Sequence, residues 1–289
     1  MARHVDYLLT AVAPAVWGST YLVTTQFLPQ GYPLTVSLLR ALPAGLLLLL
    51  LVRQLPTGVW WRRVLILGAL NFSIFWWLLF VAAYRLPGGV AATVGAIQPL
   101  IVILLARPLL GSPIRTLAVA ASLIGIAGVA LLILTPAAAL DGVGIVAGLA
   151  GAVSMAAGTV LTRLWRPPVS SLTFTAWQLT AGGLLLLPAA LWFEPALPPL
   201  TAANVGGFVY LGIVGAALTY FLWFRGLGRL EPAVVSPLAL LSPVTAVLLG
   251  WGLLAQRLTP AQIVGMVMVL GSVWVGQRTP LPVAIPRTS

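Results

Sequence analysis

Apolar residues follow one another along this chain in ten long stretches, which are separated by short segments rich in arginine, proline or glycine. Each stretch approaches the roughly 20 apolar residues that a helix needs to cross the hydrocarbon core of a bilayer. We therefore predict an all-α integral membrane protein with ten transmembrane helices. The predicted spans are residues 7–28, 34–52, 64–84, 89–106, 114–134, 142–162, 171–191, 203–224, 233–254 and 260–277.

The second half of the chain repeats the first. RLPGGVAATVGAIQPLIVIL (85–104) returns as RLEPAVVSPLALLSPVTAVL (229–248), with Pro99 opposite Pro243. Five spans per copy is an odd number, so the second copy must enter the membrane from the opposite side. We predict two inverted-topology five-helix repeats around a central cavity, with a disordered tail; the alternative is chance similarity between apolar helices. The predicted boundaries are 1–136, 137–278 and 279–289.

Composition agrees with a membrane protein. Hydrophobic residues make up 61% of the chain and charged residues 7%, against roughly a quarter charged in soluble domains. All fifteen basic residues are arginines, scattered singly or in pairs, a pattern that predicts no nucleic-acid partner despite the net charge of +11. A cytoplasmic N-terminus places twelve arginines inside and only Arg85 and Arg257 outside. We therefore predict a multi-pass protein of the bacterial inner membrane with both termini cytoplasmic.

Polar and aromatic residues deep inside spans are the candidates for contact with a solute. Polar groups within a membrane are costly and usually face the bundle interior or a wet cavity. A pocket walled by aromatic rings suits an apolar or aromatic side chain and can hold an ammonium by cation–π attraction; the alternative is that these residues only pack. The predicted substrate-binding residues are Trp17, Thr20, Tyr21, Arg40, Asn71, Phe75, Trp76, Gln98, Trp177, Gln178, Tyr220 and Ser242.

Three residues are predicted to bend the helices beside this pocket. Pro99 and Pro243 each remove a backbone donor and leave an earlier carbonyl to be satisfied by a neighbour, by water or by the solute. Gly18 allows close approach of another helix. The alternative for the two prolines is a kink that serves packing alone.

Arg40 is the only charged residue well inside a span. Its side chain either extends to the membrane interface or reaches the cavity, where it would attract a carboxylate. Its counterpart in the second repeat is the neutral Gln178. The two halves are therefore predicted to differ at this position.

The chain has few of the residues that form metal sites, proton relays and catalytic sites, and this limits the functions that it can have. The chain has no cysteine and a single histidine, His4, near its start, so we predict no metal site and no cofactor. No Asp, Glu or His lies near the middle of a span, which argues against a proton relay and against a membrane-embedded enzyme. No nucleotide-binding motif is present. We predict facilitated transport and leave open whether it is uniport or antiport.

Specific segments of the chain resemble a known family. Residues 217–251 and 255–276 are similar to the C-terminal repeat of EamA-type exporters in the drug/metabolite transporter superfamily, and residues 15–28 to the N-terminal repeat. One departure is Gln256, where the family usually has a glutamate. The resemblance, which is nearest to the YddG-type exporters of aromatic amino acids, implies a cavity bounded mainly by the first, third, fourth, sixth, eighth and ninth spans.

The function predicted from these features is export of aromatic and other neutral amino acids by alternating access. The alternative is export of drugs or of other small metabolites, such as purines or sugars. The predicted partners are the small-molecule substrate and the lipid bilayer, with no nucleotide. The sequence is compatible with a monomer and leaves the oligomeric state open.

Overall fold

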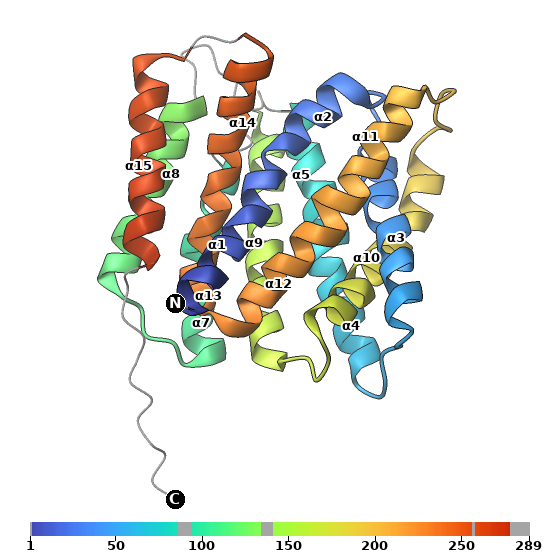
Figure 1. Ribbon diagram of the computed structural model, residues 1–289, viewed down its shortest axis with the longest axis horizontal. Coiled ribbons are helices and arrows are strands. Elements are labelled where there is room, and N and C mark those ends of the chain that lie inside the picture. The colour runs from blue at the N-terminus through green and yellow to red at the C-terminus, as the bar shows by residue number, and fades with distance from the viewer. Residues whose placement is uncertain (1, 86–93, 134–140, 256–257, 278–289) are drawn as a thin grey trace, which may run out of the picture.

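The computed structural model describes residues 2–85, 94–133, 141–255 and 258–277 (Figure 1). These residues form α-helices with short π and 3-10 segments and contain no β-strand, which confirms the all-α prediction. The predicted tail, residues 279–289, and Gln256 lie outside the described residues. The helices are α1 (Ala2–Trp17), α2 (Ser19–Phe27), α3 (Pro33–Val52), α4 (Trp60–Gly68), α5 (Ile74–Arg85), α7 (Gln98–Leu110), α8 (Thr116–Ile133), α9 (Gly142–Trp165), α10 (Ser171–Phe193), α11 (Ala202–Gly212), α12 (Thr219–Arg229), α13 (Pro232–Val235), α14 (Leu241–Leu253) and α15 (Pro260–Gln277).

Seven helical segments of the described chain are long and apolar enough to cross a membrane, and each overlaps a predicted span. Three shorter apolar helices, at Gln98–Leu110, Thr116–Leu132 and Pro260–Gly276, overlap the three remaining predicted spans, the first of them only over residues 98–106. Residues 89–93 and 134, at the edges of two of those spans, lie outside the described residues. The seven long segments are His4–Phe27, Pro33–Val52, Trp60–Ala82, Gly142–Trp165, Ser171–Phe193, Ala202–Arg229 and Pro232–Leu253.

The outside of the bundle is apolar, whereas its interior contains polar side chains. Leu50 and Trp192 are 73% and 85% exposed, while Thr175 and Gln178 are fully buried. In lipid the exposed apolar surface needs no water, and buried polar groups must find partners within the protein. This distribution is typical of a protein that is surrounded by a lipid bilayer and not by water.

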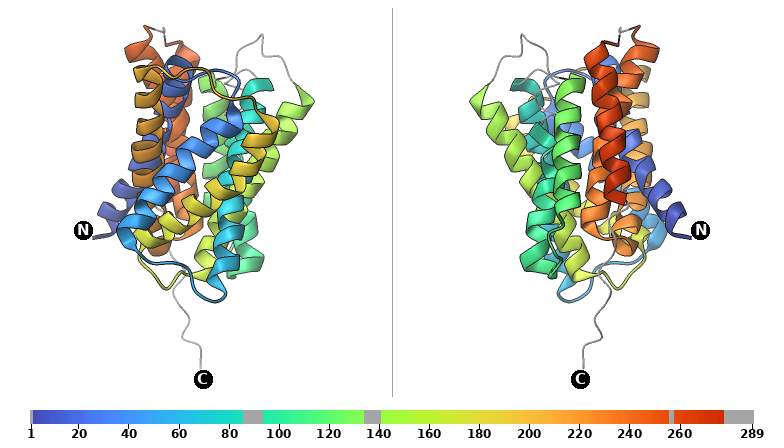
Figure 2. Two further views of the ribbon diagram at one scale, coloured as in Figure 1. Left: turned by 90° about the vertical axis from the view of Figure 1, so that its right-hand side faces the viewer. Right: turned by 90° about the vertical axis from the view of Figure 1, so that its left-hand side faces the viewer.

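The helices pack in pairs from the two halves of the chain. α3 packs along α10, α8 along α15, α5 along α9, and α1 along α12. The right-hand view of Figure 2 shows α8 and α15 side by side on the face turned toward the viewer. Where α8 meets α15, an added Cβ on Gly128 would lie 2.8 Å from the carbonyl oxygen of Gly265. Glycine at such contacts lets two backbones approach closely, which is how helices without a hydrophobic driving force associate.

Five of the helical segments are interrupted near the middle of the molecule. Short π segments, η1 (Ala69–Ser73) and η2 (Ile213–Leu218), join α4 to α5 and α11 to α12. A 3-10 segment, η3 (Ser236–Leu240), precedes α14, and Gly18 separates α1 from α2. A turn at residues 96–97 precedes α7. Such interruptions free backbone groups and are common at functional sites.

The predicted proline kinks take a different form in the structure. Pro99 is the second residue of α7 and Pro243 the third residue of α14, so each stands in the first turn of a helix and not in its interior. Proline is tolerated there because its missing N–H would have no intrahelical acceptor. The change of direction therefore lies just before each proline.

Candidate functional site

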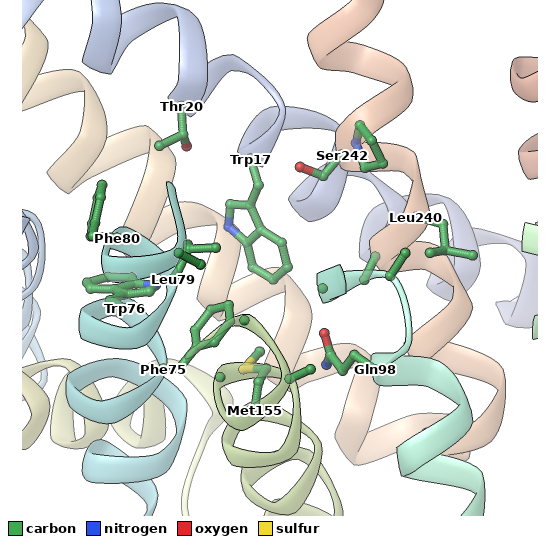
Figure 3. A pocket seen from close by; sticks show the side chains of 18 of the residues that line it. Trp17, Thr20, Phe75, Trp76, Leu79, Phe80, Gln98, Met155, Leu240 and Ser242 are labelled. Atoms are coloured by element: carbon green, nitrogen blue, oxygen red, sulfur yellow. The ribbon is translucent and has the colours of Figure 1, made fainter. Parts of the chain in front are cut away.

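A cavity of about 450 Å³ lies at the centre of the bundle. Its volume falls within the range of small-molecule binding sites, roughly 300–1,000 Å³. Residues of α1, α2, α5, α7, α9, α12 and α14 line it, together with η3 and one residue of α3. In Figure 3 Trp17 projects into the middle of this cavity, with Phe75 and Met155 on one side and Gln98 and Ser242 on the other.

Most of the residues predicted from the sequence meet at this cavity. Four do not line it, namely Gly18, Asn71, Trp177 and Gln178, and the side chain of Tyr21 lies outside the described residues. The predicted residues that do line it are Trp17, Thr20, Arg40, Phe75, Trp76, Gln98, Pro99, Tyr220, Ser242 and Pro243.

Aromatic rings form a continuous wall of the cavity. The ring of Trp17 lies 4.9 Å from that of Tyr220 and 5.2 Å from that of Trp223, measured between centroids. Tyr220 also contacts Phe72 at 4.6 Å and Trp76 at 6.0 Å. Each tilted or edge-on pair of this kind contributes about 0.5–1.5 kcal/mol beyond its buried area. These ring contacts hold the wall together beside the cavity.

A chain of hydrogen bonds fixes Arg40 in the same wall. Arg40 Nη2 donates to the carbonyl oxygen of Gly215 at 2.8 Å, and Thr219 Oγ1 donates to that carbonyl at 2.9 Å. Trp17 Nε1 in turn donates to Thr219 Oγ1 at 2.9 Å. The guanidinium carbon of Arg40 lies 4.6 Å from the centroid of the Trp76 ring, and the residue is 4% exposed. Of the two alternatives for Arg40, the structure therefore favours the cavity.

Several polar atoms at the cavity have no hydrogen-bond partner among the described residues. They are Thr20 Oγ1, Thr24 Oγ1, Gln98 Nε2 and Trp223 Nε1, and all four are buried. The residues that carry them line the cavity. An unsatisfied buried polar group costs about 1–3 kcal/mol. These atoms are therefore suited to accept or donate hydrogen bonds to a solute or to water.

Asn71 and Gln178 share one hydrogen bond behind the cavity wall. Asn71 Nδ2 donates to Gln178 Oε1 at 2.7 Å, and both residues are fully buried. Trp177 Nε1 points elsewhere and donates to the carbonyl oxygen of Gln54 at 2.5 Å. We therefore leave Asn71, Trp177 and Gln178, which were predicted to face the solute, out of the proposed binding site. A polar side chain inside a span needs a hydrogen-bond partner, and each of these two amides finds one in the other. Asn71 Oδ1 and Gln178 Nε2 have no partner among the described residues.

Some of the lining was not predicted from the sequence. Trp223 follows Tyr220 by three residues and so shares its helical face, a signal that was available. Met155 of α9 and Leu240 of η3 line the cavity with ordinary apolar side chains. Nothing in an apolar span distinguishes such residues from those that face lipid or pack in the core.

The two ends of the bundle differ. Thr24, Thr25 and Gln30, near the C-terminal end of α2, line the cavity, whereas no residue of the first three turns of α1 does so within the described chain. At that opposite end Asp6 Oδ1 pairs with Arg225 at 2.8 Å and with Arg229 at 3.1 Å. Thr10 of α1 also lies against Gly226 of α12, where an added Cβ would overlap it. The cavity is thus closed toward the start of α1.

The described residues offer no cluster of three or more His, Cys, Asp or Glu side chains that could hold a metal ion. The chemistry available in the cavity is therefore that of aromatic faces, neutral hydrogen-bonding groups and one guanidinium.

Comparison with known proteins shows which family this chain belongs to. The sequence profile of the EamA-like transporter family matches residues 5–134 and 142–275. The chain is similar to Protein PecM of Dickeya dadantii (strain 3937), with 48% identity over 92% of this chain and 90% of the relative. It is also similar to the uncharacterized inner membrane transporter YedA of Escherichia coli (strain K12), with 30% identity over 89% of this chain and 86% of the relative.

Among solved structures, a crystal structure with a similar fold has a TM-score of 0.81 and 22% identity, and the match covers 94% of this chain and 96% of the other. The family prediction from the sequence is confirmed by these comparisons, while the narrower likeness to YddG-type exporters stays a prediction. Taken with the apolar helices and the central cavity, the profile match shows that the chain is a multi-pass membrane transporter of the EamA-like transporter family.

Proposed function

We propose that the protein exports aromatic and other neutral amino acids across the bacterial inner membrane by alternating access. The observation that carries the proposal is the central cavity of about 450 Å³, walled by aromatic rings and edged by polar atoms without partners. This volume suits a solute of amino-acid size. Trp17, Phe75, Trp76 and Tyr220 would contact the apolar side chain of the solute, and Thr20, Gln98 and Ser242 its polar groups.

The proposed architecture is ten transmembrane helices in two inverted five-helix repeats. Three observations support it. The family profile matches twice, once in each half. The π segments begin at Ala69 and Ile213, 144 residues apart, and Pro99 and Pro243 are separated by the same interval.

The third observation concerns helix pairing. The repeat equates α1 with α9, α5 with α12, and α7 with α14. If the two halves are equivalent, the contact between α5 and α9 should have a counterpart between α12 and α1. Likewise, the contact between α7 and α9 should have a counterpart between α14 and α1. All four contacts are present. Such pairing is the pattern expected of a pseudo-two-fold axis in the membrane plane.

In the proposed cycle the two halves rock about the cavity, and the interruptions at Gly18, η1, η2 and η3 absorb the bending. With both termini cytoplasmic, the described state opens outward and is closed inside by the Asp6 pairs with Arg225 and Arg229. Release of these pairs would open the inner side. Because the described lining contains no carboxylate, the proposed transport is facilitated and needs no intramembrane proton relay.

Counterflow in proteoliposomes tests this function. Vesicles holding the protein are preloaded with one unlabelled amino acid, and uptake of the labelled compound is measured across a panel. We expect phenylalanine, tryptophan and other large neutral amino acids to stimulate uptake, and Gln98→Ala to reduce the effect. Stimulation by purines, sugars or drugs alone would replace the amino-acid assignment. The absence of stimulation by any amino acid would refute it.

A further inference from the structure

The cavity lining that the structure describes carries a single formal charge, and it is positive. Arg40 is the only charged residue among the described lining residues. The four acids of the whole chain stand at helix ends. Asp6 pairs with arginines, Asp141 and Glu194 accept hydrogen bonds from backbone N–H groups at the starts of α9 and α3, and Glu231 immediately precedes α13. None of the four lines the cavity, so the site presents net positive charge to a solute.

The guanidinium of Arg40 is held in a defined orientation. Its Nη2 donates to the carbonyl oxygen of Gly215, which the π segment η2 presents, and the group lies against the Trp76 ring. The carbonyl and the ring are both uncharged, so neither of these two contacts neutralises the guanidinium. A planar guanidinium matches the geometry of a carboxylate better than an ammonium group does. A fixed, buried charge of this kind inside a membrane protein is expensive and usually functional.

The described part of the lining contains no acidic group for a positive charge on the solute. Among the described lining residues, an ammonium would meet only neutral acceptors such as the Gln98 and Thr20 side chains, and aromatic faces. The apolar walls accept a ring or a large aliphatic group whether or not an amine is attached to it. A solute in this cavity would therefore be held by its acid group and its apolar body, with little contribution from an amine.

We propose that Arg40 is a carboxylate-binding subsite and that the transported class is small aromatic acids, with or without an α-amino group. The proposal rests on the proposed transport function and redefines its substrate class by the acid group and the ring, with the α-amino group dispensable. The carboxylate pairs with Arg40, and the ring lies between Trp17, Phe75 and Trp76. An amine without an acid group is excluded, because its charge is repelled by Arg40 and finds no counter-ion.

Three probes of one shape test the subsite: phenylalanine, phenylpropionate and phenethylamine. Each is added outside proteoliposomes during counterflow of labelled phenylalanine, with protein-free vesicles as the control for leakage. We expect phenylalanine and phenylpropionate to compete and phenethylamine not to compete. In Arg40→Gln the concentration of either acid needed for half-inhibition should rise by roughly 10-fold to 100-fold, the range for loss of a hydrogen bond to a charged group.

Matched variants and a binding readout separate the possible causes. Arg107→Gln removes the same charge from an exposed site at the end of α7 and should behave as wild type, and Arg40→Lys should recover part of the effect. The rise in unfolding temperature of the wild-type protein with each probe is measured in detergent, without transport. Stabilisation by both acids, with no phenylalanine counterflow, would keep the subsite and refute the proposed function. Equal competition or stabilisation by phenethylamine, no stabilisation by either acid, or identical behaviour of Arg40→Gln and Arg107→Gln would overturn the subsite.

Discussion

Gly18→Ala is expected to destabilise the protein and to abolish transport. A Cβ at this position would lie 2.6 Å from Thr245 Cβ and 3.0 Å from the backbone nitrogen of Ala246, and would overlap the carbonyl oxygen of Ser242. Two of these three atoms belong to the backbone of α14, which cannot turn aside as a flexible side chain would. Overpacking of this kind costs about 1–3 kcal/mol. Thermal unfolding in detergent should shift downward by several degrees, and counterflow should be lost.

Gly206→Ala is the matched control for this effect. It makes the same chemical change within the helix α11, where an added Cβ meets nothing within 4 Å. Alanine is favoured over glycine inside a helix by roughly 0.5–1 kcal/mol. The control should therefore unfold at the wild-type temperature or slightly above it. If the two variants behaved alike, the close contact between Gly18 and α14 would be wrong.

Trp17→Ala is expected to lower phenylalanine counterflow by at least about tenfold. The change removes two ring contacts, with Tyr220 and Trp223, and the hydrogen bond from Nε1 to Thr219 Oγ1. Without them the cavity wall loses both the indole face available to a solute ring and the support that holds Tyr220 and Trp223 in place. A loss of about 1.4 kcal/mol in solute binding is enough for a factor of ten. Trp17→Phe keeps the ring and loses only the N–H, so its effect should be intermediate.

The control for the loss of an indole is Trp77→Ala. Trp77 stands beside the cavity residue Trp76 on α5, but its side chain is 46% exposed on the outside of the bundle. This variant should keep most of the counterflow activity. A Trp17→Ala protein that transports as well as Trp77→Ala would remove the aromatic wall from the proposed binding site.

The length and apolarity of the helices were predictable from the sequence because the bilayer imposes both. The paired prolines also pointed to the centre of the molecule, since few residue types mark an interruption so clearly. Their position in the first turns of α7 and α14 was not predictable, because it depends on where the preceding segment leaves the helical path. The π segments η1 and η2 likewise have no distinct sequence pattern.

The candidate site was predictable only where a residue had no alternative role. Trp17, Trp76 and Gln98 are deep, rare residue types, and they line the cavity. Asn71 and Gln178 look equally suitable in the sequence, but each becomes the hydrogen-bond partner of the other, and that pairing depends on how η1 meets α10. The location of Arg40 depended on a carbonyl that η2 presents 175 residues further along the chain.

The measurement that tests the account most directly uses the absence of cysteine from the natural sequence. A single Ser242→Cys variant places one thiol in the lining of the cavity. A membrane-impermeant thiol reagent is applied to intact cells, and separately to inside-out vesicles, with and without phenylalanine. Alternating access predicts labelling from both sides, slowed by phenylalanine in each case. Labelling from one side only, at a rate that phenylalanine does not change, would contradict a transport site in this cavity.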